Sequence, residues 1–116
     1  MKGLELSTAI AKILDEKKAR EIKVLKIEDL TIVTDYIVIA TGTSTTQVKS
    51  LADEVDFKLN QLYSLQPTRV EGYESKNWIL MDYDTVIVHI FHPEARDYYN
   101  LDKLWADGEE VAIDLE

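Results

Sequence analysis

The stretch from residue 78 to residue 105, WILMDYDTVIVHIFHPEARDYYNLDKLW, constrains the fold more strongly than any other part of the chain. Residues 79–81 and 86–91 are rich in β-branched and aromatic side chains and flank the turn-prone Asp82-Tyr83-Asp84, so they predict an antiparallel hairpin. Pro93 ends the second strand, because proline has no N–H for a sheet ladder, yet its fixed φ suits the first turn of a helix. The stretch therefore predicts a hairpin that leads directly into a helical turn.

Periodic apolar patterns predict the elements that come before this hairpin. Residues from about 4 to 19 repeat apolar side chains at helical spacing and predict an amphipathic helix. Residues 22–27 predict a first strand. Residues 36–40, Tyr-Ile-Val-Ile-Ala, do not alternate with polar residues, which is typical of a strand buried on both faces near the middle of a sheet. Residues 69–73 predict a further short strand that leads to the hairpin.

A second helix is predicted immediately after the central strand. Ser44-Thr45-Thr46-Gln47 has the S-x-x-Q spacing of a capping box. The helix that it begins carries one apolar stripe, formed by Val48, Leu51, Ala52, Val55, Leu59 and Leu62. Near the C-terminus, Val111, Ile113 and Leu115 alternate with Ala112, Asp114 and Glu116, which predicts either an edge strand or a docked extended arm.

The order of these elements predicts an α/β fold in a single domain, residues 1–116, with an acidic tail at 107–116. We expect a mixed sheet of about five strands, flanked by helices, with at least one strand–helix–strand crossover. Each of the two long helices carries one apolar stripe, so each should cover part of a sheet face.

The charge balance narrows the class of partner. The formal net charge is −9, and the last ten residues hold five acids and no base. Direct binding to nucleic acid depends on Lys and Arg displacing counterions from phosphates, so we expect none here. A basic protein surface is a better electrostatic match, although an acidic face that promotes solubility is the commoner explanation of such a charge.

Composition also bears on the compartment. The chain contains no cysteine, which removes disulfides and thiolate metal sites and fits a reducing compartment. No apolar run approaches the roughly 20 residues that span a bilayer. We therefore expect a cytoplasmic protein without membrane contact.

Three groups of residues are candidates for a chemical site. The turn at Thr41-Gly42-Thr43-Ser44 resembles a phosphate-binding turn but lacks a GxGxxG or GxxxxGK pattern, so ordinary helix capping is favoured. Asp82 and Asp84 could hold Mg²⁺, as in metal-dependent nucleotidyltransferases, but they fall in the predicted hairpin turn, where acids are common. His89 shares a strand face with Ile87 and Phe91, which favours a hydrogen-bonded histidine beside the core. We expect no enzyme activity, no cofactor and no metal.

Aromatic side chains provide the strongest candidate for a binding surface. Five such residues occur close together in the sequence, and Arg96 lies among them: Trp78, Tyr83, Tyr98, Tyr99 and Trp105. A small core cannot easily bury all five and also give every N–H and O–H a hydrogen-bond partner. Trp, Tyr and Arg dominate the binding energy of protein interfaces. Some of these residues should pack in the core, and we expect the remainder to form a face that binds a protein.

Two long segments of the chain are distinctive: TDYIVIATGTSTTQVKSLADEV at 34–55 and the complete stretch 78–105, joined by EGYESKNW at 71–78. Together they resemble the ribosomal silencing factor family, also called Iojap. The resemblance implies a mixed sheet flanked by helices, similar to the nucleotidyltransferase fold but without a catalytic site. It also implies binding to the large (50S) ribosomal subunit through ribosomal protein fourteen, which blocks the small subunit sterically and represses translation when nutrients are scarce.

The resemblance further implies which residues meet this partner and that the free protein forms a homodimer. Carried onto this sequence, the partner-binding residues are Trp78 and Ile79, followed by Met81, Asp82, Tyr98, Tyr99, Leu101 and Trp105. Two alternatives remain open from the residues themselves. One is a metal-dependent nucleotidyltransferase-like enzyme that uses Asp82 and Asp84, and the other is a dimeric adaptor unrelated to ribosomes.

Overall fold

The structure is a computed structural model that describes residues 1–115, so Glu116, the last residue of the acidic tail, lies outside the described residues. Its helices are α1 (Gly3–Glu16), α2 (Thr45–Tyr63), α3 (Pro93–Tyr99) and α4 (Leu101–Leu104). Its strands are β1 (Arg20–Lys26), β2 (Tyr36–Thr41), β3 (Arg69–Glu71), β4 (Trp78–Asp82), β5 (Val86–Phe91) and β6 (Glu109–Glu110). Within the described part of the chain, no helix is long and apolar enough to cross a membrane.

The strands form one mixed sheet in the order β3-β4-β5-β2-β1-β6. β2 pairs with β5 in parallel, and the other neighbouring pairs are antiparallel. β3 consequently runs in the same direction as β2, and α2 connects the two, which confirms the predicted crossover. The middle position of β2 is also confirmed, because its residues from Ile37 to Thr41 are all buried.

The sheet has six strands where the sequence predicted about five. The additional strand is β6, in which Glu109 and Glu110 pair with Lys26 and Leu25 of β1. Two glutamates have little intrinsic preference for a strand, so the sequence pattern could not reveal this pairing. After β6 the chain continues as an extended arm, in which Val111 N–H donates to Val24 O at 2.9 Å and three alternating apolar residues pack on the core, namely Val111, Ile113 and Leu115. The docked-arm alternative is thus the correct one.

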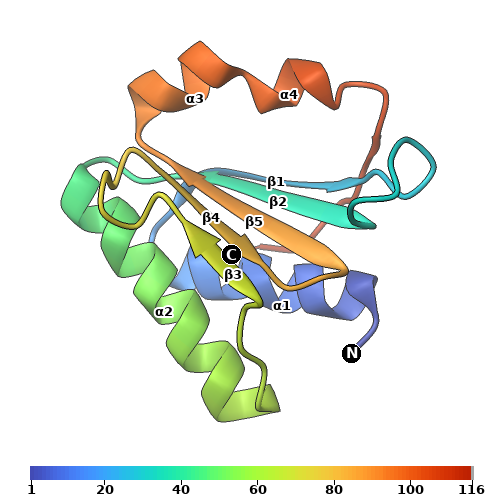
Figure 1. The fold of residues 1–116 in the computed structure, drawn as a ribbon, viewed down its shortest axis with the longest axis horizontal. Helices are drawn as coiled ribbons and strands as arrows, with labels where there is room; N and C mark the ends of the chain where they lie inside the picture. The colour runs from blue at the N-terminus through green and yellow to red at the C-terminus, as the bar shows by residue number, and fades with distance from the viewer. Residues whose placement is uncertain (116) are drawn as a thin grey trace.

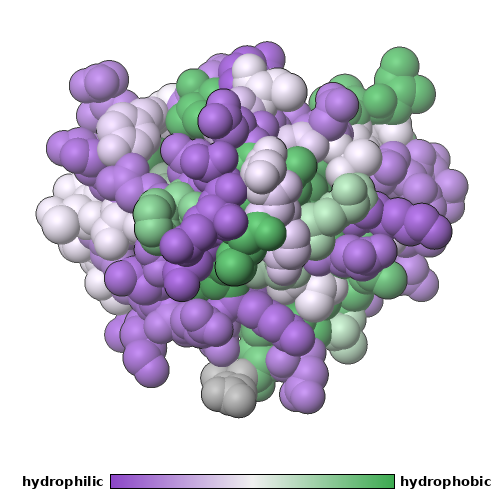
Figure 2. Space-filling view, turned by 90° about the horizontal axis from the view of Figure 1, so that it is seen from below, coloured by the Kyte–Doolittle hydropathy of each residue, from purple (hydrophilic) through white to green (hydrophobic). Residues whose placement is uncertain are grey.

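The elements lie in three layers (Figure 1). α1 and α2 cover one face of the sheet, where their apolar stripes meet residues such as Val38, Met81, Val88 and Ile90. The short helices α3 and α4 cross the opposite face, above a second cluster of buried residues that comprises Leu25, Ile27, Ile37, Ile39, Ile87, Phe91 and Leu101. Figure 2 views the molecule from the side of α1 and α2, where hydrophilic side chains cover most of the surface and small apolar areas lie between them.

The start of α2 forms as the capping-box spacing predicts. Ser44 Oγ accepts a hydrogen bond from Gln47 N–H at 3.1 Å, and Gln47 Oε1 accepts from the N–H and hydroxyl of Thr43 at 2.5 and 2.7 Å. The apolar stripe is buried as far as Leu59, but Leu62 is exposed, contrary to expectation. Figure 1 shows that the C-terminal end of α2 extends away from the sheet.

The turn between β4 and β5 begins one residue later than the predicted turn Asp82-Tyr83-Asp84. Asp82 still belongs to β4, and the reversal runs from Tyr83 to Val86, where Tyr83 N–H donates to Val86 O at 2.9 Å. Asp84 occupies the left-handed region with φ 77°. Tyr83 is buried on the side of α1 and α2, which removes it from the candidate surface residues.

Candidate functional site

The first residue of β4 and the last residue of β5 lie opposite each other and form the base of the candidate site. Trp78 and Phe91 are partners in the antiparallel register. His92 and Pro93 follow at once and begin α3, with the His92 side chain accepting a hydrogen bond from Glu94 N–H. Because the helix starts where the strand ends, its last residues, including Tyr99, return over the beginning of β4.

Five aromatic side chains make continuous contact at this corner. The Trp78 ring centroid lies 4.5 Å from that of Tyr99, 5.1 Å from Phe91 and 5.8 Å from His89. Tyr98 packs edge-on against Tyr99 at 5.0 Å, and edge-to-face pairs of this kind are attractive beyond their buried area. We call Trp78, Tyr98 and Tyr99 the aromatic surface, since His89 and Phe91 lie buried beneath them.

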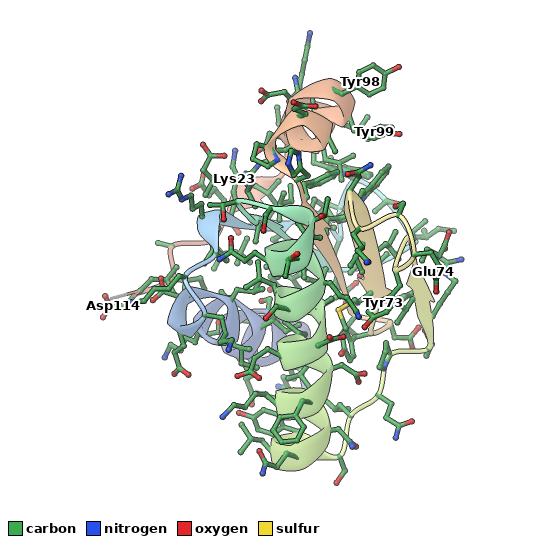
Figure 3. The ribbon with its side chains drawn as sticks, turned by 90° about the vertical axis from the view of Figure 1, so that its left-hand side faces the viewer. Lys23, Tyr73, Glu74, Tyr98, Tyr99 and Asp114 are labelled. Carbon is green, nitrogen blue, oxygen red and sulfur yellow. The ribbon has the colours of Figure 1, made fainter. Side chains whose placement is uncertain are left out.

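Exposure increases outward across the aromatic surface. Trp78 is half-buried, Tyr99 is 50% exposed and Tyr98 is 82% exposed. Figure 3 shows both tyrosines projecting from α3, with Tyr98 the farther from the sheet. Beside them lies an open cleft of about 400 Å³, lined by Glu71, Gly72, Ser75, Asn77, Trp78, Leu80 and Tyr99. A cleft with an aromatic wall and a few polar groups can receive a protruding side chain of a partner protein.

His89 orients Trp78 from below. Trp78 Nε1–H donates to His89 Nδ1 at 3.0 Å, so the imidazole accepts this bond in its neutral form. Burial lowers the pKa of His89 to about 4, because the charged ring would be poorly solvated there. The predicted role of His89, a hydrogen-bonded histidine beside the core, is confirmed. What the sequence did not suggest is that its partner is Trp78.

The depressed pKa of His89 predicts a stability loss in mild acid. An unfolded histidine titrates near 6.5, so between pH 6.5 and 4 the unfolded chain takes up a proton that the folded chain does not. The free energy of unfolding should therefore fall as pH decreases through this window, by up to about 3 kcal/mol from this group. Urea denaturation at pH 7, 6 and 5 measures the slope.

The control for this prediction is His89→Gln, whose side-chain oxygen can still accept from Trp78 but does not titrate. All other side chains are the same in the two proteins, so the difference in slope isolates His89. The same slope in wild type and His89→Gln would show that His89 is not responsible.

Gly72 allows the loop between β3 and β4 to approach the backbone of Trp78. It has φ +79°, and a Cβ at this position would clash with the Trp78 carbonyl oxygen. The loop is also tied to α2, because the Tyr73 hydroxyl donates to Asp53 Oδ1 at 2.7 Å and Lys49 Nζ lies 5.4 Å from the Tyr73 ring centroid. Figure 3 shows Tyr73 and Glu74 on this loop, below the two tyrosines of α3. These contacts fix the cleft wall opposite Tyr99.

Arg96 anchors α3 and α4 to the sheet. Its guanidinium donates to Asp102 Oδ1 and Oδ2 at 3.3 and 3.0 Å, to Thr41 Oγ1 at 2.9 Å and to the Glu21 carbonyl at 2.6 Å. Burial disfavours the charged form of Asp102, but the hydrogen bonds and charge of Arg96 outweigh this effect and lower the pKa of Asp102. Arg96 is 9% exposed, so it positions the aromatic residues and does not itself present a guanidinium to a partner.

The structure separates the predicted partner-binding residues into three groups. It brings together Trp78, Tyr98 and Tyr99. Ile79 and Met81 are fully buried on the opposite side of β4, against α2, and Leu101 is buried beneath α4. Successive side chains of a strand point to opposite faces, so Ile79 and Met81 lie on the face of β4 away from Trp78. A partner-binding role for these buried residues remains a prediction. In the folded chain these side chains support the surface from behind.

Two further predicted residues lie outside the aromatic surface. Asp82 is at the far end of β4, roughly 13 Å from Trp78 at the usual rise per residue. Its Oδ2 lies 3.7 Å from Arg69 Nη2, and its Oδ1 accepts from Asp84 N–H at 2.8 Å. Trp105 follows α4 and is partly buried against the second cluster. Trp105 is not part of the aromatic surface, and its partner-binding role remains a prediction.

The metal-site alternative gains no support from the geometry of Asp82 and Asp84. The carboxylate of Asp82 is occupied by the turn and by Arg69, and Asp84 lies in the turn itself. Over residues 1–115, no three His, Cys, Asp or Glu side chains are grouped so that they could hold a metal ion.

Leu80 and Gly72 are two of the cleft residues that the sequence analysis did not identify. Leu80 lies between Trp78 and Asp82 on the same strand face and lines the cleft. The two-residue period of β4 was available as a signal, since it places residues 78, 80 and 82 on one face. No comparable local signal identifies the close approach of Gly72 to Trp78.

The fold and the site define a class of protein: a small three-layer α/β domain that presents aromatic side chains beside a shallow cleft. The sequence model described as "Ribosomal silencing factor during starvation" matches residues 2–116. The chain belongs to this family, the ribosomal silencing factor (RsfS) family, as the sequence predicted.

Individual relatives agree over nearly the whole chain. Ribosomal silencing factor RsfS of Halalkalibacterium halodurans is 36% identical over 114 residues, which cover 98% of this chain and 97% of that protein. A crystal structure of a protein from Chromobacterium violaceum superposes with a TM-score of 0.87 at 34% identity and covers 100% of this chain and 95% of that one. The mouse protein named "Mitochondrial assembly of ribosomal large subunit protein 1" is 30% identical over 98 residues, 83% of this chain but 43% of its own length.

Proposed function

We propose that this protein binds the large ribosomal subunit through ribosomal protein fourteen and sterically prevents the small subunit from joining. In this role it represses translation under nutrient limitation. The observation that carries the proposal is the aromatic surface, in which Trp78, Tyr99 and Tyr98 form one contiguous, increasingly exposed group beside a cleft. Membership of the silencing-factor family supports a ribosomal role, and the name of the mouse relative, which mentions the ribosomal large subunit, supports the choice of subunit.

The energetics suit a binding function. Large aromatic side chains that are already packed against one another lose little conformational freedom when a partner covers them. Trp78 has its Nε1–H satisfied by His89, so covering its ring leaves no buried donor unpaired. A net charge of −9 favours encounter with a basic ribosomal protein and disfavours direct contact with RNA phosphates. Steric blocking requires that the protein binds tightly and occupies space where the small subunit would contact the large one, and it requires no chemical reaction.

Sedimentation tests the proposal. The protein is mixed separately with purified 50S and 30S particles and centrifuged through a sucrose cushion. We expect it to pellet with 50S and to remain in the supernatant with 30S, and free ribosomal protein fourteen should compete for it. Equal recovery with both particles, or with neither, would contradict the proposal. A pull-down dominated by non-ribosomal proteins would support the adaptor alternative.

We further propose that the protein acts in the cytoplasm and forms a homodimer when it is not on the ribosome. The dimer rests on the family resemblance, and sedimentation velocity over a range of concentrations tests it. A sedimentation coefficient that stays at the monomer value at every concentration would contradict the dimer without affecting the ribosomal role.

A further inference from the structure

The loop between β1 and β2, residues 27–35, exposes three apolar side chains within four positions. Leu30 is 46% exposed, Val33 is 68% exposed and Ile32 is fully exposed. Isolated exposed apolar residues are common on protein surfaces, but a contiguous group marks an interaction site more often. Figure 1 shows the loop projecting beyond the sheet, at the end opposite to the one where α3 begins.

Local hydrogen bonds hold the loop in this outward conformation. Leu30 N–H and Thr31 N–H donate to Ile27 O at 2.8 and 3.2 Å, and Val33 N–H donates to Thr31 Oγ1 at 3.1 Å. Thr34 is buried, and its hydroxyl lies 3.1 Å from the carbonyl oxygen of Asp84 in the neighbouring hairpin. The apolar side chains are therefore presented on an ordered support, which lowers the entropy cost of binding.

The charges around this apolar tip indicate the kind of partner. Glu28 and Asp29 are exposed on one side of it, and Asp35 is partly exposed on the other. Lys26, the basic residue at the end of β1, is engaged with Glu28 at 3.0 Å. An apolar tip flanked by acids complements a basic protein surface that has an apolar recess. The same acids disfavour an anionic bilayer or a second copy of a chain with net charge −9.

The loop and the aromatic surface lie at opposite ends of the sheet. The loop leads into Tyr36 at the start of β2, whereas Trp78 lies across from Phe91, which pairs with Thr41 at the end of β2. A six-residue strand is about 20 Å long, so a partner that touches both places must span about this distance. Such a span requires a macromolecular partner.

We propose that the β1–β2 loop is a second docking element, which inserts Ile32 and Val33 into an apolar recess on a basic protein of the large ribosomal subunit. The inference rests on the proposed function and adds a second point of attachment to it. Two attachment points raise the overall affinity and fix the orientation of the bound domain.

The test compares two double variants that each remove exposed apolar surface. Ile32→Ser/Val33→Ser alters the loop, and the matched control Phe57→Ser/Leu62→Ser alters α2, whose residues 57 and 62 are 58% and 60% exposed. Binding of each full-length protein to purified 50S particles is measured at several salt concentrations, together with the thermal midpoint. We expect the loop variant to bind about tenfold more weakly with an unchanged midpoint, and the control to bind like wild type.

The outcomes separate this inference from the proposed function. Wild-type affinity of the loop variant for 50S would overturn the loop proposal alone. A loop variant that keeps its 50S affinity but no longer self-associates, or no longer binds anionic vesicles, would overturn it as well and assign the loop to that other occupant. If wild type itself fails to bind 50S, both proposals fall. Equal weakening in the α2 control would show that the effect is not specific to the loop.

Discussion

Replacing Trp78 with alanine is expected to weaken binding to the large ribosomal subunit by about 2 kcal/mol or more, a loss of roughly 30-fold. The substitution removes the ring that contacts Tyr99, Phe91 and His89, and it leaves His89 Nδ1 without its donor. The aromatic surface then loses both its central contact and the support that places Tyr99. Equilibrium binding of labelled protein to purified 50S particles measures the effect.

Two further variants separate lost contact from lost fold. Tyr98 is 82% exposed, so Tyr98→Ala should weaken binding while the free energy of unfolding stays within about 0.5 kcal/mol of wild type. Phe57→Ala removes an exposed aromatic side chain from α2, on the other side of the sheet, and should change neither quantity. Wild-type affinity in folded Trp78→Ala and Tyr98→Ala would show that the aromatic surface does not contact the ribosome.

Gly72→Ala is expected to lower the free energy of unfolding by about 2 kcal/mol or more. The added Cβ would clash with the Trp78 carbonyl oxygen, and φ +79° is unfavourable for any residue with a Cβ. Either the loop or the start of β4 must move, so Trp78 should be displaced as well. Urea denaturation and the near-ultraviolet circular dichroism of the aromatic cluster measure the two effects.

Ser75→Ala is the matched control for Gly72→Ala. It lies in the same turn and loses one exposed hydrogen bond, from Ser75 Oγ to Gly72 O, so the expected change is at most about 0.5 kcal/mol. If Gly72→Ala retained wild-type stability and an unchanged aromatic spectrum, the close approach of the two backbones would not be important for the site.

Much of the fold could be predicted because local chemistry and global packing agree. The apolar run at 36–40 predicted a central strand, the S-x-x-Q spacing predicted the start of α2, and Pro93 predicted the change from strand to helix. The pairing of β6 and the exposure of Leu62 could not be predicted in this way, because they depend on where distant elements end. The periodicity of a segment predicts its own secondary structure, whereas the pairing of β6 and the exposure of Leu62 depend on neighbouring elements.

The site was predicted in part for a related reason. The aromatic residues Trp78, Tyr98 and Tyr99 were identified from their type, and the structure brings them together. Ile79 follows Trp78 directly in sequence, but strand alternation places its side chain on the other face of β4, so its predicted partner-binding role is not supported by exposure in the folded chain. The buried role of Arg96 follows from tertiary contacts with Glu21, Thr41 and Asp102, which no local pattern contains.

Subunit joining tests the central proposal most directly. Purified 50S and 30S particles are mixed with increasing amounts of wild-type protein or Tyr98→Ala, and formation of 70S particles is followed by light scattering. We predict that wild type suppresses 70S formation when it is added to 50S before 30S, and that Tyr98→Ala needs a higher concentration for the same suppression. Undiminished 70S formation at concentrations of wild-type protein that saturate 50S would contradict the steric account.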